Sequence, residues 1–140
     1  MAVFATGLLT SEQSLPLHGR IIAVPRDLEP RDGAYELFCG DEGAAVVFVV
    51  YHQGEPLDLS AFTVELLADG IDGSPFALEQ APNAMPSADA TKGEVRWVVP
   101  DEVTAEPRTF RAQLVVRQAG EADRASNVIR FRVRRRVEDD

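Results

Sequence analysis

Apolar residues recur along this chain in short alternating or continuous stretches, and turn-forming residues separate the stretches. The longest continuous run covers residues 44–51, contains four valines, and lies between Gly40-Asp41 and Gly54. A run of this length and composition, bounded by turns, predicts a strand buried on both faces, because valines disfavour so short a helix. We take this run as the central strand of the core.

Other stretches alternate apolar and polar residues with the period of two that is typical of a strand with one face on a core. In 94–99, Val95, Trp97 and Val99 are expected to point inward, with Trp97 as a core anchor. Further strands are expected at 20–24 (ended by Pro25), 35–39, 62–68, 76–78, 109–118 and 126–135. About seven strands with frequent turns and no helical stripe predict an all-β fold, an immunoglobulin-like antiparallel β-sandwich.

The 140 residues are enough for one domain, which we place at residues 20–136. Residues 1–19 lack a clear period and are predicted to form an irregular N-terminal arm, and 137–140 form an acidic C-terminal tail. The arm carries Phe4, Leu8 and Leu9, which would be unfavourable if exposed on a free monomer. We therefore expect the arm to dock on a neighbouring subunit, and a frayed terminus is the alternative.

Charge is distributed unevenly along the chain. The net charge is -9 and the pI is about 4.7, which argues against nucleic acid or an anionic membrane surface as a partner. The final stretch is the exception, because arginines occupy one side of the expected strand and its end: Arg130, Arg132, Arg134, Arg135 and Arg136. This face is either solvated and paired with the chain's own acids, or a docking face for an acidic partner surface.

No motif in the sequence predicts catalysis or a cofactor. His18 and His52 lack partners at metal-ligand spacing, and Asp69 and Asp72 are better explained by a hairpin turn than by a calcium loop. Cys39 is the only cysteine, so no internal disulfide can form, and we expect it to be a small buried apolar residue. We therefore expect a protein that is not an enzyme and that needs no cofactor or metal. The longest predicted loop covers 81–91, and whether it binds a ligand stays open.

Short motifs in the predicted strand order resemble those of one protein family. They are Gly40-Asp41 before the core strand, the step at 56–60 (PLDLS), the glycine-started strand at 93–97 (GEVRW) and the last strand beginning Ser126-Asn127. Together these residues resemble the N-terminal immunoglobulin-like domain of phage upper baseplate (BppU-like) proteins. One departure is the entry to the penultimate strand, where the family often has Gly-Tyr and this chain has Thr109-Phe110. Phenylalanine has no hydroxyl group, so a tyrosine-corner hydrogen bond cannot form at that position.

The resemblance implies a structural adaptor of the phage tail tip, without a reaction or a cofactor, whose partners are other virion proteins and further copies in a symmetric assembly. It also implies synthesis in the host cytoplasm followed by incorporation into the virion, which agrees with the lack of a secretory signal pattern at the N-terminus. Two alternatives stay open: a capsid decoration protein with a docking arm, and a carbohydrate- or protein-binding sandwich module. An exposed Trp97 would favour a carbohydrate-binding module, because sugars stack on aromatic platforms.

Overall fold

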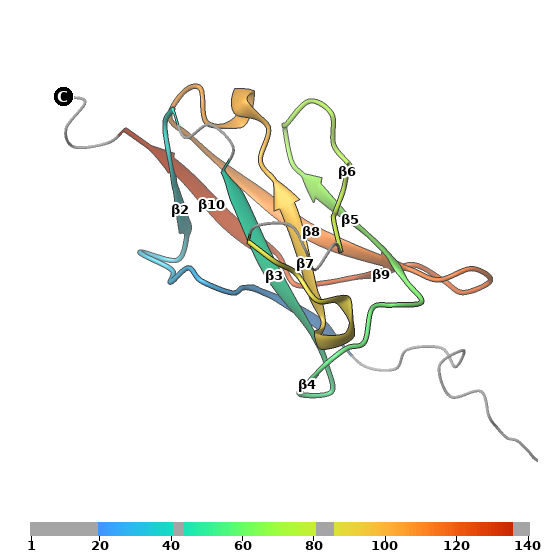
Figure 1. Cartoon of the computed structure of the whole chain (residues 1–140). Coiled ribbons are helices and arrows are strands. Elements are labelled where there is room, and N and C mark those ends of the chain that lie inside the picture. The colour runs from blue at the N-terminus through green and yellow to red at the C-terminus, as the bar shows by residue number, and fades with distance from the viewer. Residues whose placement is uncertain (1–19, 41–43, 81–85, 136–140) are drawn as a thin grey trace, which may run out of the picture.

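The computed structural model describes residues 20–40, 44–80 and 86–135, and this part of the chain forms a two-layer β-sandwich (Figure 1). Ten strands are present, and seven of them have four residues or more. The only helical elements among these residues are two short 3-10 turns, η2 (Ala90–Lys92) and η3 (Asp101–Val103). The prediction of an all-β sandwich with about seven main strands is therefore confirmed.

The first sheet is built around β3 (Ala45–His52), the strand predicted to be central. β1 (Ile21–Pro25) pairs with one edge of β3, while β7 (Glu94–Val98) and the two-residue β4 (Glu55–Pro56) pair with the other edge. All of these pairs are antiparallel. Pro25 forms the last position of β1 rather than ending the strand before it, which proline tolerates at a strand end.

The second sheet has β8 (Arg108–Arg117) and β10 (Ile129–Arg134) at its centre. Its remaining strands are β2 (Tyr35–Phe38), β5 (Thr63–Ala68), β6 (Phe76–Ala77) and β9 (Arg124–Ala125). The strand order is β2-β10-β8-β5-β6, with β9 on β8. β2 runs parallel to β10, so the expectation of a wholly antiparallel sandwich is wrong at this edge. After β1 in the first sheet, the chain crosses to the second sheet, where β2 lies beside β10, the last strand of the chain, and runs in the same direction.

Alternating side chains of both sheets meet in a core that is centred on aromatic rings. Trp97 lies with its ring centroid 6.2 Å from that of Phe110, 6.0 Å from that of Phe131 and 5.7 Å from that of Phe76. Phe110 and Phe131, from the neighbouring strands β8 and β10, stack with centroids 5.3 Å apart. Val95, Trp97 and Val99 are all buried, as the alternation predicted.

The last predicted strand begins later than expected, because Ser126, Asn127 and Val128 interrupt the ladder between β9 and β10. The Ser126 hydroxyl accepts a hydrogen bond from the Leu114 backbone N–H (3.0 Å) and donates to the Asn127 carbonyl (2.9 Å). The Asn127 side chain crosses to the other sheet, where Oδ1 accepts from the Ala23 N–H (2.7 Å) and Nδ2 donates to the Ala23 carbonyl (3.2 Å). The Asn127 amide thus provides hydrogen-bond partners for the backbone of Ala23 at the edge of β1, and it links the two sheets.

Replacing Asn127 with alanine is expected to lower the free energy of unfolding by about 1–3 kcal/mol, because the Ala23 N–H and carbonyl lose their partner at a buried residue. Urea unfolding followed by circular dichroism measures the change. The control is Val128→Ala at the exposed neighbouring position, where a change within about 0.5 kcal/mol is expected. Equal stabilities of the two variants would contradict a linking role for Asn127.

Other residues of the motifs that carry the family resemblance, at 56–60 and 93–97, also have structural roles. Asp58 Oδ1 accepts hydrogen bonds from the Ser60 N–H (3.0 Å) and hydroxyl (2.6 Å), which close the turn after β4 and lower the pKa of the Asp58 carboxyl. Leu59 between them is fully buried. Gly93 has a φ of +78°, and its carbonyl accepts a hydrogen bond from the Val50 N–H (2.8 Å). These motifs therefore specify the sandwich itself.

Candidate docking surface

The predicted arginine face lies on the outer side of the second sheet. Along β10, Ile129, Phe131 and Val133 are buried in the core, so Arg130 and Arg132 point to the opposite side. Arg134 continues this side, and Arg135 is exposed just beyond the strand. The alternation that the sequence predicted thus places Arg130, Arg132 and Arg134 on one surface, with Arg135 at its end, and their role in an interface stays a prediction.

Arg134 is neutralised within the domain. Its Nη1 lies 2.7 Å from Glu36 Oε2 on the parallel neighbour β2, and Arg31 Nη1 lies 3.6 Å from the other carboxylate oxygen. The hydrogen bond from Arg134 lowers the pKa of Glu36 below its usual range, and the charges of Arg134 and Arg31 act in the same direction. At this end of the strand, the interpretation of a face paired with the chain's own acids is the correct one.

Arg130 and Arg132 differ from Arg134, because neither side chain has an ion-pair partner within residues 20–40, 44–80 and 86–135. Arg130 lies directly opposite Arg111 of β8 in the antiparallel ladder. Like charges in such a position repel each other, and here only Arg111 is compensated, by Asp69 Oδ2 at 2.7 Å. The surface therefore keeps uncompensated positive charge at Arg130 and Arg132.

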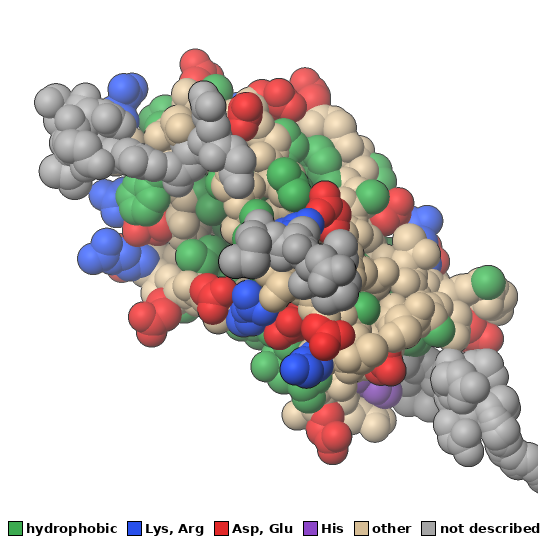
Figure 2. Space-filling model, in the orientation of Figure 1, with side chains coloured by type: hydrophobic (Ala, Val, Ile, Leu, Met, Phe, Trp, Pro, Cys, Tyr) green, Lys and Arg blue, Asp and Glu red, His purple; other side chains and the backbone are tan. Residues whose placement is uncertain are grey.

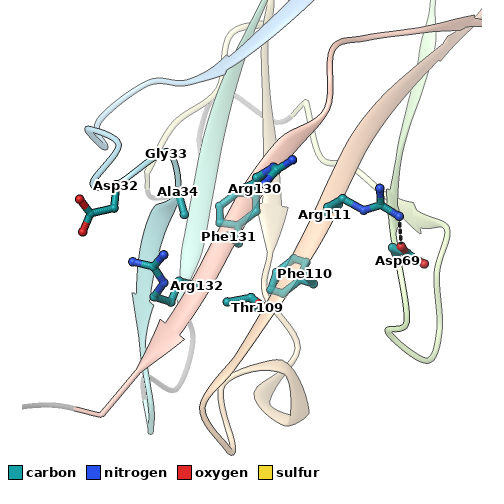
Figure 3. A pocket seen from close by; sticks show the side chains of 10 residues that line it. All are labelled: Asp32, Gly33, Ala34, Asp69, Thr109, Phe110, Arg111, Arg130, Phe131 and Arg132. Atoms are coloured by element: carbon teal, nitrogen blue, oxygen red, sulfur yellow. Dashed lines mark hydrogen bonds and ion pairs between the residues drawn. The ribbon is translucent and has the colours of Figure 1, made fainter.

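These arginines border a hollow of about 420 Å³ on the sheet surface (Figure 3). Arg130, Arg132 and Thr109 come from the two central strands, and Asp32 to Ala34 of the connection before β2 form one side. On the other side, Figure 3 shows Arg111 turned toward Asp69 and away from Arg132. The hollow thus presents two guanidinium groups that can bind a carboxylate or another anion.

Several of the predicted interface residues lie outside the described residues. They are Phe4, Leu8 and Leu9 of the expected arm, and Arg136 after the last strand. The boundaries predicted at 1–19 and 137–140 fall in the same undescribed parts.

The outer face of the first sheet is apolar at several positions. Ile22 and Val24 on β1 and Val98 on β7 are exposed large hydrophobic side chains. In the orientation of Figure 1, the space-filling view shows hydrophobic, acidic and basic side chains intermingled over the visible surface (Figure 2). Charged residues of one sign are not gathered there, in contrast to the arginine side of β10.

Sequence reasoning did not single out Arg96, a buried cation on β7 that is only 5% exposed. It donates hydrogen bonds to Glu79 Oε1 and to the Pro86 carbonyl (2.9 Å), and it holds the segment after residue 85 against the first sheet. A signal was available: the continuous apolar run predicted that β3 is buried on both faces. Val47 on the outer face is indeed buried, and it pairs in register with Arg96.

The remaining features raised by the sequence are a metal site, a membrane-spanning segment, a sugar platform at Trp97 and the burial of Cys39. No group of three or more His, Cys, Asp or Glu side chains there could hold a metal ion, and no helix among them is long and apolar enough to cross a membrane. Trp97 is buried, so it offers no platform for a sugar. Cys39 is half-buried against the core, which is less than the full burial expected.

A scan against protein-family models finds no matching family, and a search of curated proteins finds no similar sequence.

Proposed function

We propose that this protein is a non-enzymatic structural component of a bacteriophage particle, a tail or baseplate adaptor that docks through the outer face of its second sheet. The observation that carries the proposal is the pair Arg130 and Arg132, which point outward without an ion-pair partner in the described residues. Charged groups that stay unpaired on a rigid sheet suit recognition of a complementary surface. The resemblance to upper baseplate proteins gives the biological setting.

The chemistry of the surface supports binding rather than reaction. Guanidinium groups stay protonated at physiological pH, so Arg130 and Arg132 bind anions and do not transfer protons. Two carboxylates of this face, Asp69 and Glu36, accept ion pairs from Arg111 and Arg134, and Asp32 lines the hollow without an ion pair to Arg130 or Arg132. The proposed partners are other virion structural proteins and further copies of this chain in a symmetric assembly, with the arm residues Phe4, Leu8 and Leu9 as a second contact.

Immunogold labelling of intact particles, viewed by negative-stain electron microscopy, tests the proposal. We expect label at the tail tip. Label over the head would replace the adaptor role with that of a capsid decoration protein, which needs the same kind of docking surface. Particles without label would refute a virion role and leave a protein-binding module.

A further inference from the structure

The hollow beside Arg130 is one part of a longer trough on the second sheet. It shares Arg111 and Asp69 with a second hollow of about 520 Å³, and Thr109 and Arg132 with a third of about 660 Å³. The second hollow extends to Leu67 and Val128, and the third extends to Arg135. The three hollows therefore adjoin one another along the outer side of β8 and β10.

The chemistry of this trough changes from one end to the other. At the first end, Val128 is 53% exposed and Leu67 is 39% exposed, so two aliphatic side chains face solvent together. The middle contains the uncompensated Arg130 and Arg132. At the far end lie Arg108, Arg134 and Arg135, of which Arg134 is paired with Glu36. The lining also includes Asp32 and Asp69, of which Asp69 is paired with Arg111. A ligand that matches the trough is therefore apolar at one end and places its anionic groups at Arg130 and Arg132.

The length of the trough indicates the conformation of such a ligand. Seven residue steps separate Val128 from Arg135, and a strand rises roughly 3.3 Å per residue, so the trough is about 23 Å long. An extended peptide of roughly eight residues spans that distance. Helical ligands of that length would cover only about half of it.

We infer that the trough binds an extended acidic segment of a partner protein, with an apolar side chain over Leu67 and Val128 and carboxylates on Arg130 and Arg132. Arginine recognises carboxylates through paired hydrogen bonds, which a sheet surface can present at fixed spacing. A bound carboxylate also relieves the repulsion between Arg130 and Arg111. The inference rests on the docking role proposed above and adds the chemistry of the partner segment.

The net charge of -9 opposes an acidic ligand at long range, but screening limits this effect. At physiological salt the Debye length is about 8 Å, so groups in contact with the ligand decide the affinity. Salt added beyond this level should weaken the binding, because it also screens the exposed contacts between arginine and carboxylate.

Fluorescence anisotropy with the full chain tests the inference, using a labelled peptide of about eight residues that begins with two leucines and continues with glutamates. We expect binding at physiological salt, and no binding of the same peptide with glutamines in place of the glutamates. The double variant Arg130→Ala/Arg132→Ala should bind about tenfold more weakly or worse, because two charge-assisted contacts are lost. The affinity of Arg130→Lys/Arg132→Lys should lie between that of the unchanged protein and that of the double alanine variant, because lysine keeps the charge but cannot form the paired hydrogen bonds.

Arg117→Ala is the matched control. Arg117 lies on the outer side of β8, is half-exposed, and pairs with Glu65 (3.1 Å) and Asp123 (3.6 Å). It lines none of the three hollows. Its replacement should change the affinity by less than about twofold, as is usual for an exposed pair outside a binding site. Thermal melting of each variant checks that the fold is kept.

Several outcomes would overturn the inference. Equal affinities of the double variant and the Arg117 variant would show that the trough is not the binding site. Tighter binding of a single-stranded oligonucleotide through the same arginines would make the partner a nucleic acid. A rise of about tenfold in the affinity for the peptide when residues 137–140 are removed would show that the chain's own acidic tail occupies the trough. Because these measurements need no virion, they can fail or succeed independently of the immunogold result.

Discussion

Replacing Trp97 with alanine is expected to lower the free energy of unfolding by about 3–5 kcal/mol, the largest effect of any single substitution considered for this chain. The ring extends from the first sheet, is 1% exposed and lies within about 6 Å of three phenylalanine rings of the second sheet. Its removal leaves a cavity that Phe110 and Phe131 cannot fill without giving up their own contacts. A domain of ordinary stability has about 5–15 kcal/mol in total, so the variant is expected to be marginally folded.

Urea unfolding followed by far-ultraviolet circular dichroism measures this change, since Trp97 is the only tryptophan and its fluorescence is lost with it. The matched variant is Trp97→Phe. The indole N–H is buried and donates to no acceptor in the described residues, so its loss offsets part of the smaller cavity. We expect a net change of about 1 kcal/mol for phenylalanine. Similar losses for alanine and phenylalanine would contradict a packing role and point to a hidden acceptor.

Replacing Gly93 with alanine is expected to cost about 2–4 kcal/mol, the second largest effect. The backbone has a φ of +78°, which disfavours any side chain, and an added Cβ would lie 2.7 Å from the Val50 carbonyl oxygen. It would also lie about 3.1 Å from the Leu57 carbonyl oxygen. Both neighbours are backbone atoms of the first sheet and its β4 turn, so the strain cannot be relieved by turning a side chain.

Gly120→Ala separates the two causes of this loss. Gly120 has almost the same φ, +82°, but nothing lies within 4 Å of an added Cβ. Its replacement should cost only about 1–2 kcal/mol, the penalty of the left-handed conformation alone. Thermal or urea unfolding of both variants gives the difference. If the two losses are equal, then the close approach of Val50 to Gly93 does not hold in solution.

The core and the candidate docking surface are two sides of the same strands. Phe110 and Phe131 point inward from β8 and β10, and Arg111, Arg130 and Arg132 point outward from the adjacent positions. The stacked rings therefore hold the two strands in the register that sets the spacing of the arginines. Core variants are expected to weaken stability and binding together, whereas the outward arginine variants should weaken binding alone.

The local pattern of apolar and polar residues was sufficient to predict the longer strands and most of their inward-facing side chains, but not the two-residue strands β4 and β9. The period of two in 109–118 and 126–135 predicted the burial of inward residues such as Phe110 and Phe131, although Val115 on the opposite side is buried as well. The same period predicted that Arg130, Arg132 and Arg134 share a side. These properties follow from adjacent residues, because successive side chains of a strand alternate between its two faces. The proposed place in a phage particle, by contrast, rests on resemblance and on the shape and charge of one surface.

Only the tertiary structure shows which residues far apart in the sequence pair with each other. Arg134 is neutralised by Glu36, 98 positions away, and Arg111 by Asp69, 42 positions away. No local pattern could therefore show that Arg130 and Arg132 have no ion-pair partner in the part of the chain that the structure describes. The tertiary structure also decides three further features: β2 runs parallel to β10, Asn127 links to Ala23, and Arg96 is buried. Alternation specifies the face on which a side chain lies, whereas sheet order and register decide which groups meet there, because they depend on the packing of the whole chain.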